Sequence, residues 1–203
     1  MKSIKNLLVS AALGFVFLSS CAVGPLVSHE TARTVGNSKS ELIAGAGQAG
    51  FIAKWNYGLR ENLDFGVHWE SLSLGIRLKY AFENNEAGWS FASSLGTGGS
   101  IGGSHYYGDL IASHKHGAWE PYTTLRVVHV KNDPIDFRDE NTGALDFTVN
   151  KSEYDYGQFM LGTRYWFSHQ WLLSVEASTL FSNSSDFKLK QNLLAGAAIG
   201  YKF

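Results

Sequence analysis

Apolar residues recur at every second position over much of this chain. The clearest example is LSLGIRLKYAF, residues 72–82, in which every even position is apolar while the odd positions carry Arg77 and Lys79. Alternation with a period of two is typical of a β-strand that has one apolar and one polar face. Residues 63–70 (LDFGVHWE) and 171–181 (WLLSVEASTLF) show the same pattern. The sequence therefore predicts an all-β protein.

Clusters of turn-forming residues divide this pattern into ten expected strands. They cover residues 41–47, 51–57, 63–70, 73–82, 88–98, 105–113, 119–131, 153–167, 170–182 and 192–203. A three-residue connection at 48–50 would pair Gly47 with Phe51, and a two-residue hairpin at 71–72 would pair Glu70 with Ser73. A bulge in place of the second hairpin is the alternative. If residues 41–57 and 63–82 each form one long strand, the count is eight.

The composition favours a barrel in a membrane over a soluble sheet. Charged residues make up 17% of the chain and aromatic residues 14%, with 22 Gly and 3 Pro. After residue 21 no run reaches the roughly 18–20 apolar residues that a spanning helix needs, and a closed sheet is the other structure that satisfies every backbone group in lipid. We therefore predict a closed antiparallel transmembrane β-barrel of ten strands, with eight as the alternative. A soluble sandwich or a lipocalin-like barrel, with its apolar face inward, is the rival interpretation.

Aromatic residues gather beside the short expected connections. These residues are Trp55, Tyr57, Tyr80, Phe82, Trp89, Trp119, Trp166, Trp171, Tyr201 and Phe203. We expect them to form a girdle at one membrane interface, on the periplasmic side where barrel turns are short. The longest connection, residues 132–152, is then an extracellular loop, and an even strand count places both ends of the chain on the periplasmic side.

The first residues have the features of an export signal. Lys2 and Lys5 precede an apolar run that ends at Leu18, and small residues follow. LSSC, residues 18–21, resembles the lipobox of bacterial lipoprotein signal peptides. That resemblance implies a diacylglycerol on Cys21, cleavage before it, and a fatty acyl chain such as palmitate on the new amino terminus. We expect a signal peptide at 1–20, a lipidated tether and lead-in at 21–39, and the barrel at 40–203; ordinary cleavage after Ala22, with loss of Cys21, is the alternative.

The last residues alternate up to an aromatic terminus. In NLLAGAAIGYKF, Ile199, Tyr201 and Phe203 share one apolar face. The ending resembles the C-terminal insertion signal of bacterial outer-membrane barrels, which implies recognition by the barrel assembly machinery. TARTVG (31–36) and NYGLRENLDFGVHW (56–69) are similar to stretches of small barrels of this kind. The resemblance implies the bacterial outer membrane, a lipid anchor on its periplasmic side, and outer-membrane lipid, lipopolysaccharide and lipoprotein-processing enzymes as partners.

Alternation also assigns a set of charged and polar side chains to the inside of the barrel. The set comprises Lys54, Asp64, His68, Glu70, Arg77, Lys79, Asp109, Arg126, Arg164, Glu176 and Lys202. Buried charges must be paired, so we expect an ion-pair network that fills the lumen. A thin polar channel with a slight preference for anions is the alternative.

No catalytic or metal constellation is evident. His114 and His116 fall in an expected turn and lack two further ligands for zinc. Ser104, His105 and Asp109 occur together in GGSHYYGD, but a triad is defined by geometry. A formal net charge of −1 gives no reason to expect nucleic acid as a partner. We therefore predict a structural or surface-interaction role without cofactor or catalysis; a small pore is the first alternative, and a lipid A or phospholipid hydrolase the second.

Overall fold

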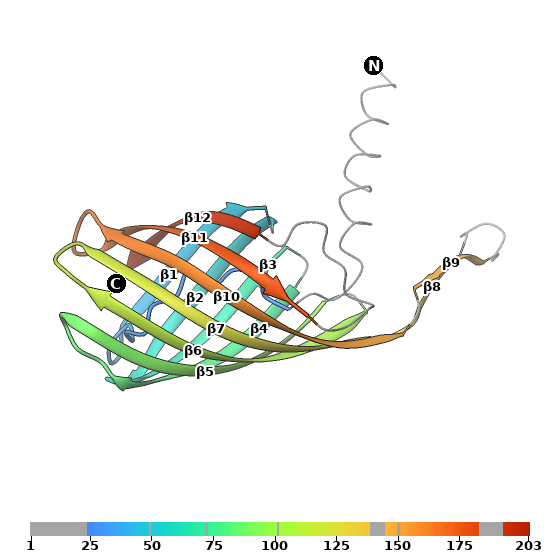
Figure 1. Ribbon diagram of the computed structural model, residues 1–203, viewed down its shortest axis with the longest axis horizontal. Coiled ribbons are helices and arrows are strands. Elements are labelled where there is room, and N and C mark those ends of the chain that lie inside the picture. The colour runs from blue at the N-terminus through green and yellow to red at the C-terminus, as the bar shows by residue number, and fades with distance from the viewer. Residues whose placement is uncertain are drawn as a thin grey trace, which may run out of the picture.

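The computed structural model describes residues 24–48, 50–71, 73–100, 102–138, 145–149, 151–182 and 193–203. The expected signal peptide and Cys21 lie outside these residues. Ten strands form a closed antiparallel barrel in the order β1-β12-β11-β10-β7-β6-β5-β4-β3-β2 (Figure 1). They are β1 (Ser40–Gly47), β2 (Gly50–Arg60), β3 (Leu63–Glu70), β4 (Ser73–Glu83), β5 (Gly88–Ser100), β6 (Gly103–Lys115), β7 (Trp119–Asn132), β10 (Ser152–Trp166), β11 (Trp171–Phe181) and β12 (Leu193–Lys202). The prediction of ten strands is confirmed, and the count of eight is wrong.

Pairing of the first strand with the last closes the sheet. β1 runs antiparallel to β12 from Glu41 opposite Lys202 to Gly47 opposite Gly196. Closure leaves no unpaired sheet edge, which is the condition for a sheet to survive without water on its outer face. The described part of the chain contains no helix that could cross a membrane.

The two mouths of the barrel differ. Phe203 and the connections β2–β3, β4–β5, β6–β7 and β10–β11 lie at one mouth, which we call the C-terminal mouth (Figure 1). The β1–β2, β3–β4 and β5–β6 hairpins lie at the other, the hairpin mouth. Beyond it, β8 (Ile135–Arg138) and β9 (Leu145–Val149) pair as a two-stranded extension between β7 and β10. The expected loop 132–152 is therefore in part a hairpin.

The β3–β4 hairpin has the predicted register. Glu70 pairs with Ser73, and the connection contains Ser71 at a φ of 50°. A left-handed residue is what a two-residue hairpin turn requires. The bulge that was the alternative is absent, since β3 and β4 are separate, regularly paired strands.

The β1–β2 hairpin is one residue shorter than predicted. Gly47 pairs with Gly50, and Phe51 pairs with Ala46 on the outer face. Gly50 has a φ of 101°, a conformation that glycine adopts without a steric penalty. The three-residue connection is wrong because it would have set Phe51 beside an inward-facing position.

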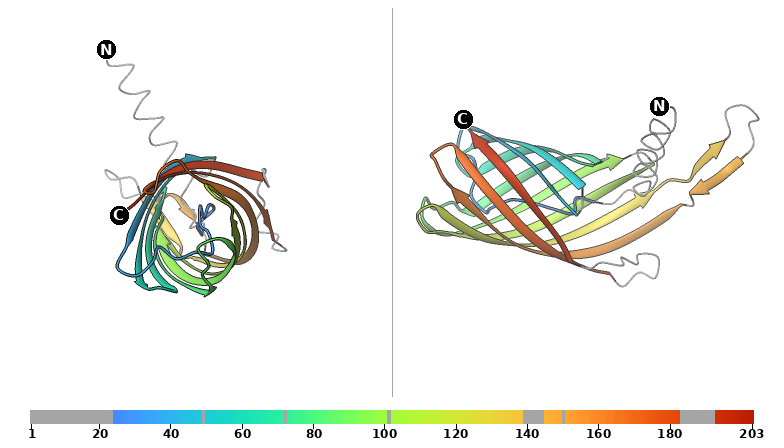
Figure 2. Two further views of the ribbon diagram at one scale, coloured as in Figure 1. Left: turned by 90° about the vertical axis from the view of Figure 1, so that its left-hand side faces the viewer. Right: turned by 90° about the horizontal axis from the view of Figure 1, so that it is seen from above.

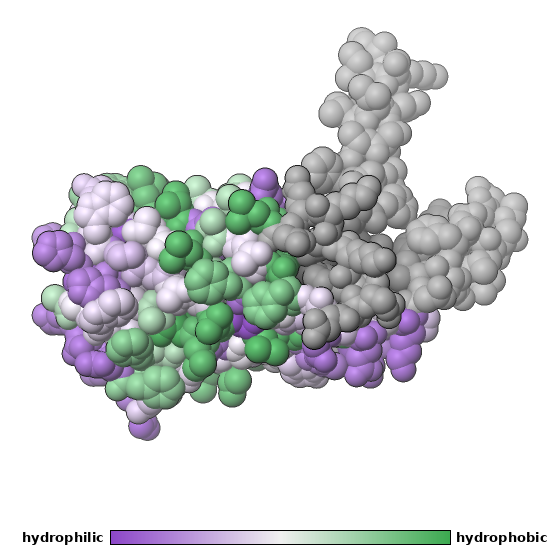
Figure 3. All heavy atoms as spheres, viewed as in Figure 1, coloured by the Kyte–Doolittle hydropathy of each residue, from purple (hydrophilic) through white to green (hydrophobic). Residues whose placement is uncertain are grey.

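The apolar face of each strand points outward. Leu74, Ile76 and Leu78 are 60%, 48% and 48% exposed, whereas Arg77 and Lys79 at the alternate positions are buried. Apolar residues accordingly gather on the flank of the barrel, and hydrophilic ones lie toward its ends (Figure 3). A soluble sandwich or lipocalin-like barrel would have the opposite arrangement, so that interpretation is wrong.

Most of the expected aromatic girdle lies on this outer face at the C-terminal mouth. The exposed members there include Trp55, Tyr80, Phe82, Trp89, Trp119, Trp171 and Phe203. Trp166 is an exception, because it shares the inward phase of Arg164 and its indole Nε1 lies 3.5 Å from the Glu120 carboxylate. A second, smaller aromatic contact lies at the hairpin mouth, where Phe51 and Trp69 pack edge to face at 5.0 Å.

Candidate functional site

The lumen of the barrel contains the chain's own amino-terminal residues. We call residues 24–35 the lumen segment; it has no regular secondary structure and runs inside the barrel (Figure 2). Ser28, His29, Glu30, Thr31 and Ala32 are each 0–1% exposed. We expected residues 21–39 to form a tether and lead-in; instead, residues 24–35 fill the lumen, and only 36–39 lead into β1.

The lumen segment spans the barrel from mouth to mouth. At the C-terminal mouth, the Arg33 Nε donates to the Asn85 carbonyl in the β4–β5 connection at 2.6 Å. At the hairpin mouth, the Leu26 amide donates to Glu70, the last residue of β3, at 2.9 Å. A Cβ on Gly24 would meet the Val128 side chain. Gly24 therefore lies toward the hairpin mouth, whereas Phe203 lies at the C-terminal mouth. The residues before Gly24 lie outside the described part of the chain, so the expectation that both ends share one side stays a prediction.

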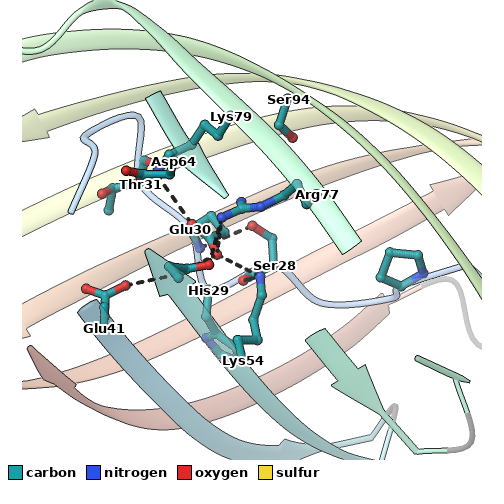
Figure 4. Close-up of polar contacts among 12 residues, drawn as sticks. Ser28, His29, Glu30, Thr31, Glu41, Lys54, Asp64, Arg77, Lys79 and Ser94 are labelled. Atoms are coloured by element: carbon teal, nitrogen blue, oxygen red, sulfur yellow. Dashed lines mark hydrogen bonds and ion pairs between the residues drawn. The ribbon is translucent and has the colours of Figure 1, made fainter. Parts of the chain in front are cut away.

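Glu30 is the charged centre of the lumen. Its carboxylate lies 2.8 Å from the Lys54 Nζ and 3.1 Å from Arg77 Nη2. The Lys79 Nζ lies 3.6 Å away and also pairs with Asp64 at 3.2 Å. Figure 4 shows the cations converging on Glu30 from β2 and β4. Because each partner is buried, removal of one would leave charges with neither water nor a counter-ion.

Wall carboxylates bind the backbone amides of the lumen segment. Glu176 on β11 accepts hydrogen bonds from the amides of Ser28 and His29, both at 2.7 Å. Glu70 accepts the Leu26 amide as described above. Tyr122 also donates to Glu176 at 2.9 Å. Backbone groups of a segment without secondary structure need such partners when they are buried.

Wall cations and one amide bind its carbonyls. Arg126 donates to the Pro25 carbonyl at 2.7 Å, and Lys54 donates to the Ser28 carbonyl at 2.6 Å. Arg164 and Gln158 donate to the carbonyls of His29 and Leu26, respectively. Lys79 donates to the Arg33 carbonyl at 2.6 Å. Hydrogen bonds with a charged donor or acceptor are about twice as strong as neutral ones.

Further ion pairs join the wall to itself and to the lumen segment. Arg126 pairs with Asp109 at 2.7 Å, Arg164 with Glu41 at 3.0 Å, and Arg33 with Glu120 at 2.6 Å. The first joins direct cross-strand neighbours on β6 and β7, the second joins β10 to β1, and the third joins the lumen segment to β7. Four predicted lumen residues have other surroundings. Glu70 and Glu176 bind backbone amides as described above. His68 is buried beside the rings of His105 and Tyr107, and Lys202 is half-buried opposite Glu41 on the adjacent strand.

Four charged residues of the lumen were not predicted. Glu41 and Glu120 are inward-facing wall residues, and they raise the inward carboxylates to the number of predicted cations. Glu120 was missed because apolar and polar residues alternate poorly in strand 119–131. Glu41 was missed because it is the first residue of its expected strand. Glu30 and Arg33 were missed because the lumen segment has no periodicity. The excess of cations assigned to the lumen was the available signal that carboxylates were missing.

The residues considered for catalysis do not form a triad. His105 and Asp109 both face inward, but Asp109 is bound by Arg126 and Ser94. His114 packs against Trp89 at the outer face, with ring centroids 5.0 Å apart. Within the described residues no three His, Cys, Asp or Glu side chains are grouped so as to hold a metal ion.

The filled lumen leaves little room near the C-terminal mouth. A cavity of about 50 Å³ lies there, lined by residues that include Arg33, Asp64, Lys79, Glu120 and Arg164. This volume accommodates a few water molecules at most. The arrangement can therefore hold a polypeptide segment in place, and it leaves no space there for a larger solute.

Comparison with known proteins supports the fold. No family model and no curated protein sequence matches the chain. Similar solved structures include the NanC porin, at 9% identity and a TM-score of 0.51 over 81% of this chain and 98% of that chain. The N-terminal barrel of Pseudomonas aeruginosa OprF is 12% identical, with a TM-score of 0.40 over 81% of this chain and 96% of that chain. Yersinia pestis Ail is 16% identical, with a TM-score of 0.38 over 81% of this chain and 97% of that chain. The chain is thus a small closed antiparallel β-barrel with the fold seen in the NanC porin.

Proposed function

We propose that this protein is a bacterial outer-membrane β-barrel with a structural or surface-interaction role, closed to solutes by its own lumen segment. The exposed apolar flank suits acyl chains, and the polar interior with its fully paired sheet suits a membrane-spanning barrel. The observation that carries the closure is the burial of residues 28–32 along the barrel axis.

The alternatives have less support. An open channel needs a continuous polar path, whereas the lumen segment occupies it from Leu26 to Arg33. A lipid-modifying enzyme needs a nucleophile and base in contact, whereas neither ring nitrogen of His105 has a hydrogen-bond partner among the described residues, and Asp109 is bound by Arg126. We therefore propose a role without catalysis.

We propose that the hairpin mouth faces the outside of the cell, with the β8–β9 extension projecting toward lipopolysaccharide. The short connections and the aromatic girdle at the C-terminal mouth favour this orientation. Ile199 and Phe203 are exposed on the outer face and Tyr201 lies between them, which suits recognition by the barrel assembly machinery.

The expected lipid anchor at Cys21 lies outside the residues that the structure describes, so the anchor and its side of the membrane stay predictions. Whether Cys21 is acylated is decided by metabolic labelling with a palmitate analogue.

Conductance across planar bilayers tests the closure. The intact full-length chain should produce no reproducible openings above those of lipid alone. Openings of the intact chain whose ion selectivity changes in Arg126→Gln would establish the channel and overturn the proposed closure.

A further inference from the structure

The wall of the lumen recognises the lumen segment mainly through its backbone. Amides at three positions, Leu26, Ser28 and His29, are held by Glu70 and Glu176. Carbonyls on both sides of these positions accept hydrogen bonds from charged or amide side chains of β2, β4, β7 and β10. Such contacts do not depend on the side chains of the segment. They fit one backbone conformation, in which His29 has a φ of 49° and the Glu30 amide donates to the Ser28 hydroxyl.

Two charged side chains of the lumen segment are recognised by the wall. Arg33 pairs with Glu120 at 2.6 Å, and Glu30 binds a cluster of cations. Glu30 is the carboxylate on which Lys54, Arg77 and Lys79 converge, with all four side chains buried. Its distance along the chain from the amides bound by Glu176 fixes the register in which the segment lies. A peptide shifted by one residue would lose either the amide contacts or the carboxylate contact.

Within the described residues, the segment is joined covalently to the barrel through residues 36–39. Asn37, Ser38 and Lys39 are exposed at the C-terminal mouth, while the contacts that hold residues 24–35 are noncovalent. The segment is thus arranged as a ligand that is tethered to its own binding site.

We infer that the lumen is a binding channel for a peptide that carries a carboxylate and, three residues later, a cation, and that residues 24–35 occupy it in cis. This inference rests on the proposed closure of the lumen. The ligand class is a peptide with a carboxylate followed three residues later by a cation, because the wall offers backbone partners along its length, the cations around Glu30 at one position, and Glu120 against Arg33 at the other.

The test uses the full chain after it has folded. A protease site replaces residues 37–39, and the purified barrel is nicked there, which leaves the lumen segment held without a covalent bond. A fluorescent peptide of residues 24–38 is then added, and its uptake is followed by fluorescence anisotropy and by competition with unlabelled peptide.

The labelled peptide should exchange into the nicked barrel, bind saturably and be competed by the unlabelled peptide. A Glu30→Gln peptide should bind about 100-fold more weakly, as expected for loss of one partner of a buried ion cluster. The matched control carries Glu30→Gln together with Asn37→Asp; it has the original net charge, but its carboxylate lies outside the lumen, so it should bind as weakly as the single variant.

Two results would overturn the inference. If the nicked barrel never takes up the labelled peptide, the segment is a permanent part of the fold. If Glu30→Gln binds as tightly as the parent peptide, the cation cluster does not select a carboxylate. Neither result says whether the intact chain conducts ions. The proposed closure is therefore tested separately, by the conductance of the unnicked protein.

Discussion

Substitution of Glu30 by glutamine removes one negative charge from the centre of the lumen and nearly preserves the volume of the side chain. Lys79 keeps Asp64 at 3.2 Å as a partner, but Lys54 and Arg77 lose the carboxylate at 2.8 Å and 3.1 Å. Removal of one partner of a buried ion pair costs about 3–5 kcal/mol, because the remaining charge stays buried without compensation. We expect Glu30→Gln to lower the free energy of unfolding by about this amount.

The measurement is urea unfolding in detergent micelles, followed by tryptophan fluorescence. Glu61→Gln is the control, because Glu61 is an exposed carboxylate in the β2–β3 connection, and its change should stay within about 0.5 kcal/mol. In the Glu30→Gln background, Lys54→Met should recover part of the loss, since it removes a cation that is no longer paired. A loss below about 1 kcal/mol for Glu30→Gln, or strictly additive effects with Lys54→Met, would refute a central role of this cluster.

Three further predictions concern orientation, assembly and the fit of the lumen segment. In intact cells a membrane-impermeant maleimide should label Asp133→Cys more strongly than the parent chain. It should label Asn37→Cys only after the outer membrane is permeabilised, and the reverse pattern would contradict the proposed orientation. Deletion of Phe203 removes its two backbone hydrogen bonds to Ser40, at 2.8 Å and 2.9 Å, together with the terminal aromatic, and should lower the heat-modifiable fraction seen on gels; an unchanged fraction contradicts a role in insertion. In Gly58→Ala the new Cβ would lie 1.9 Å from the Gly36 carbonyl oxygen, in the chain that leads into β1. We therefore expect the free energy of unfolding in urea to fall by about 1–3 kcal/mol, and an unchanged value would show that this contact relaxes freely.

The barrel could be predicted because its pattern is local. Along β4 successive side chains point to opposite faces of the sheet, so the alternation of apolar and polar residues alone predicts that Leu74 faces outward and Arg77 inward. The β3–β4 hairpin followed from the change of phase between Trp69 and Leu72. The same logic failed by one residue at Gly47, where small residues on both faces leave the phase weakly marked.

The lumen segment could not be predicted because its structure depends on distant residues. SHETAR, residues 28–33, has no period, and its partners lie on strands that follow it by up to about 150 residues. Nothing local distinguishes such a stretch from a solvated linker. The charge balance of the lumen carried no trace of it either, because the wall residues Glu41 and Glu120 supply the two carboxylates that the prediction lacked, and Glu30 and Arg33 of the segment cancel each other.

The lumen segment also bears on how the closing seam of the barrel is held. Along β1 and β12, Gly45, Ala46 and Gly47 face Ala198, Ala197 and Gly196, so this seam has backbone hydrogen bonds but little side-chain contact. Arg164 on β10 reaches across to Glu41 on β1 at 3.0 Å. Glu176 on β11 binds the segment that continues into β1. Because both links bypass β12, the lumen network joins β10 and β11 to the chain of β1 in addition to the backbone hydrogen bonds of the seam. The contacts that hold the lumen segment therefore also support the closure of the sheet.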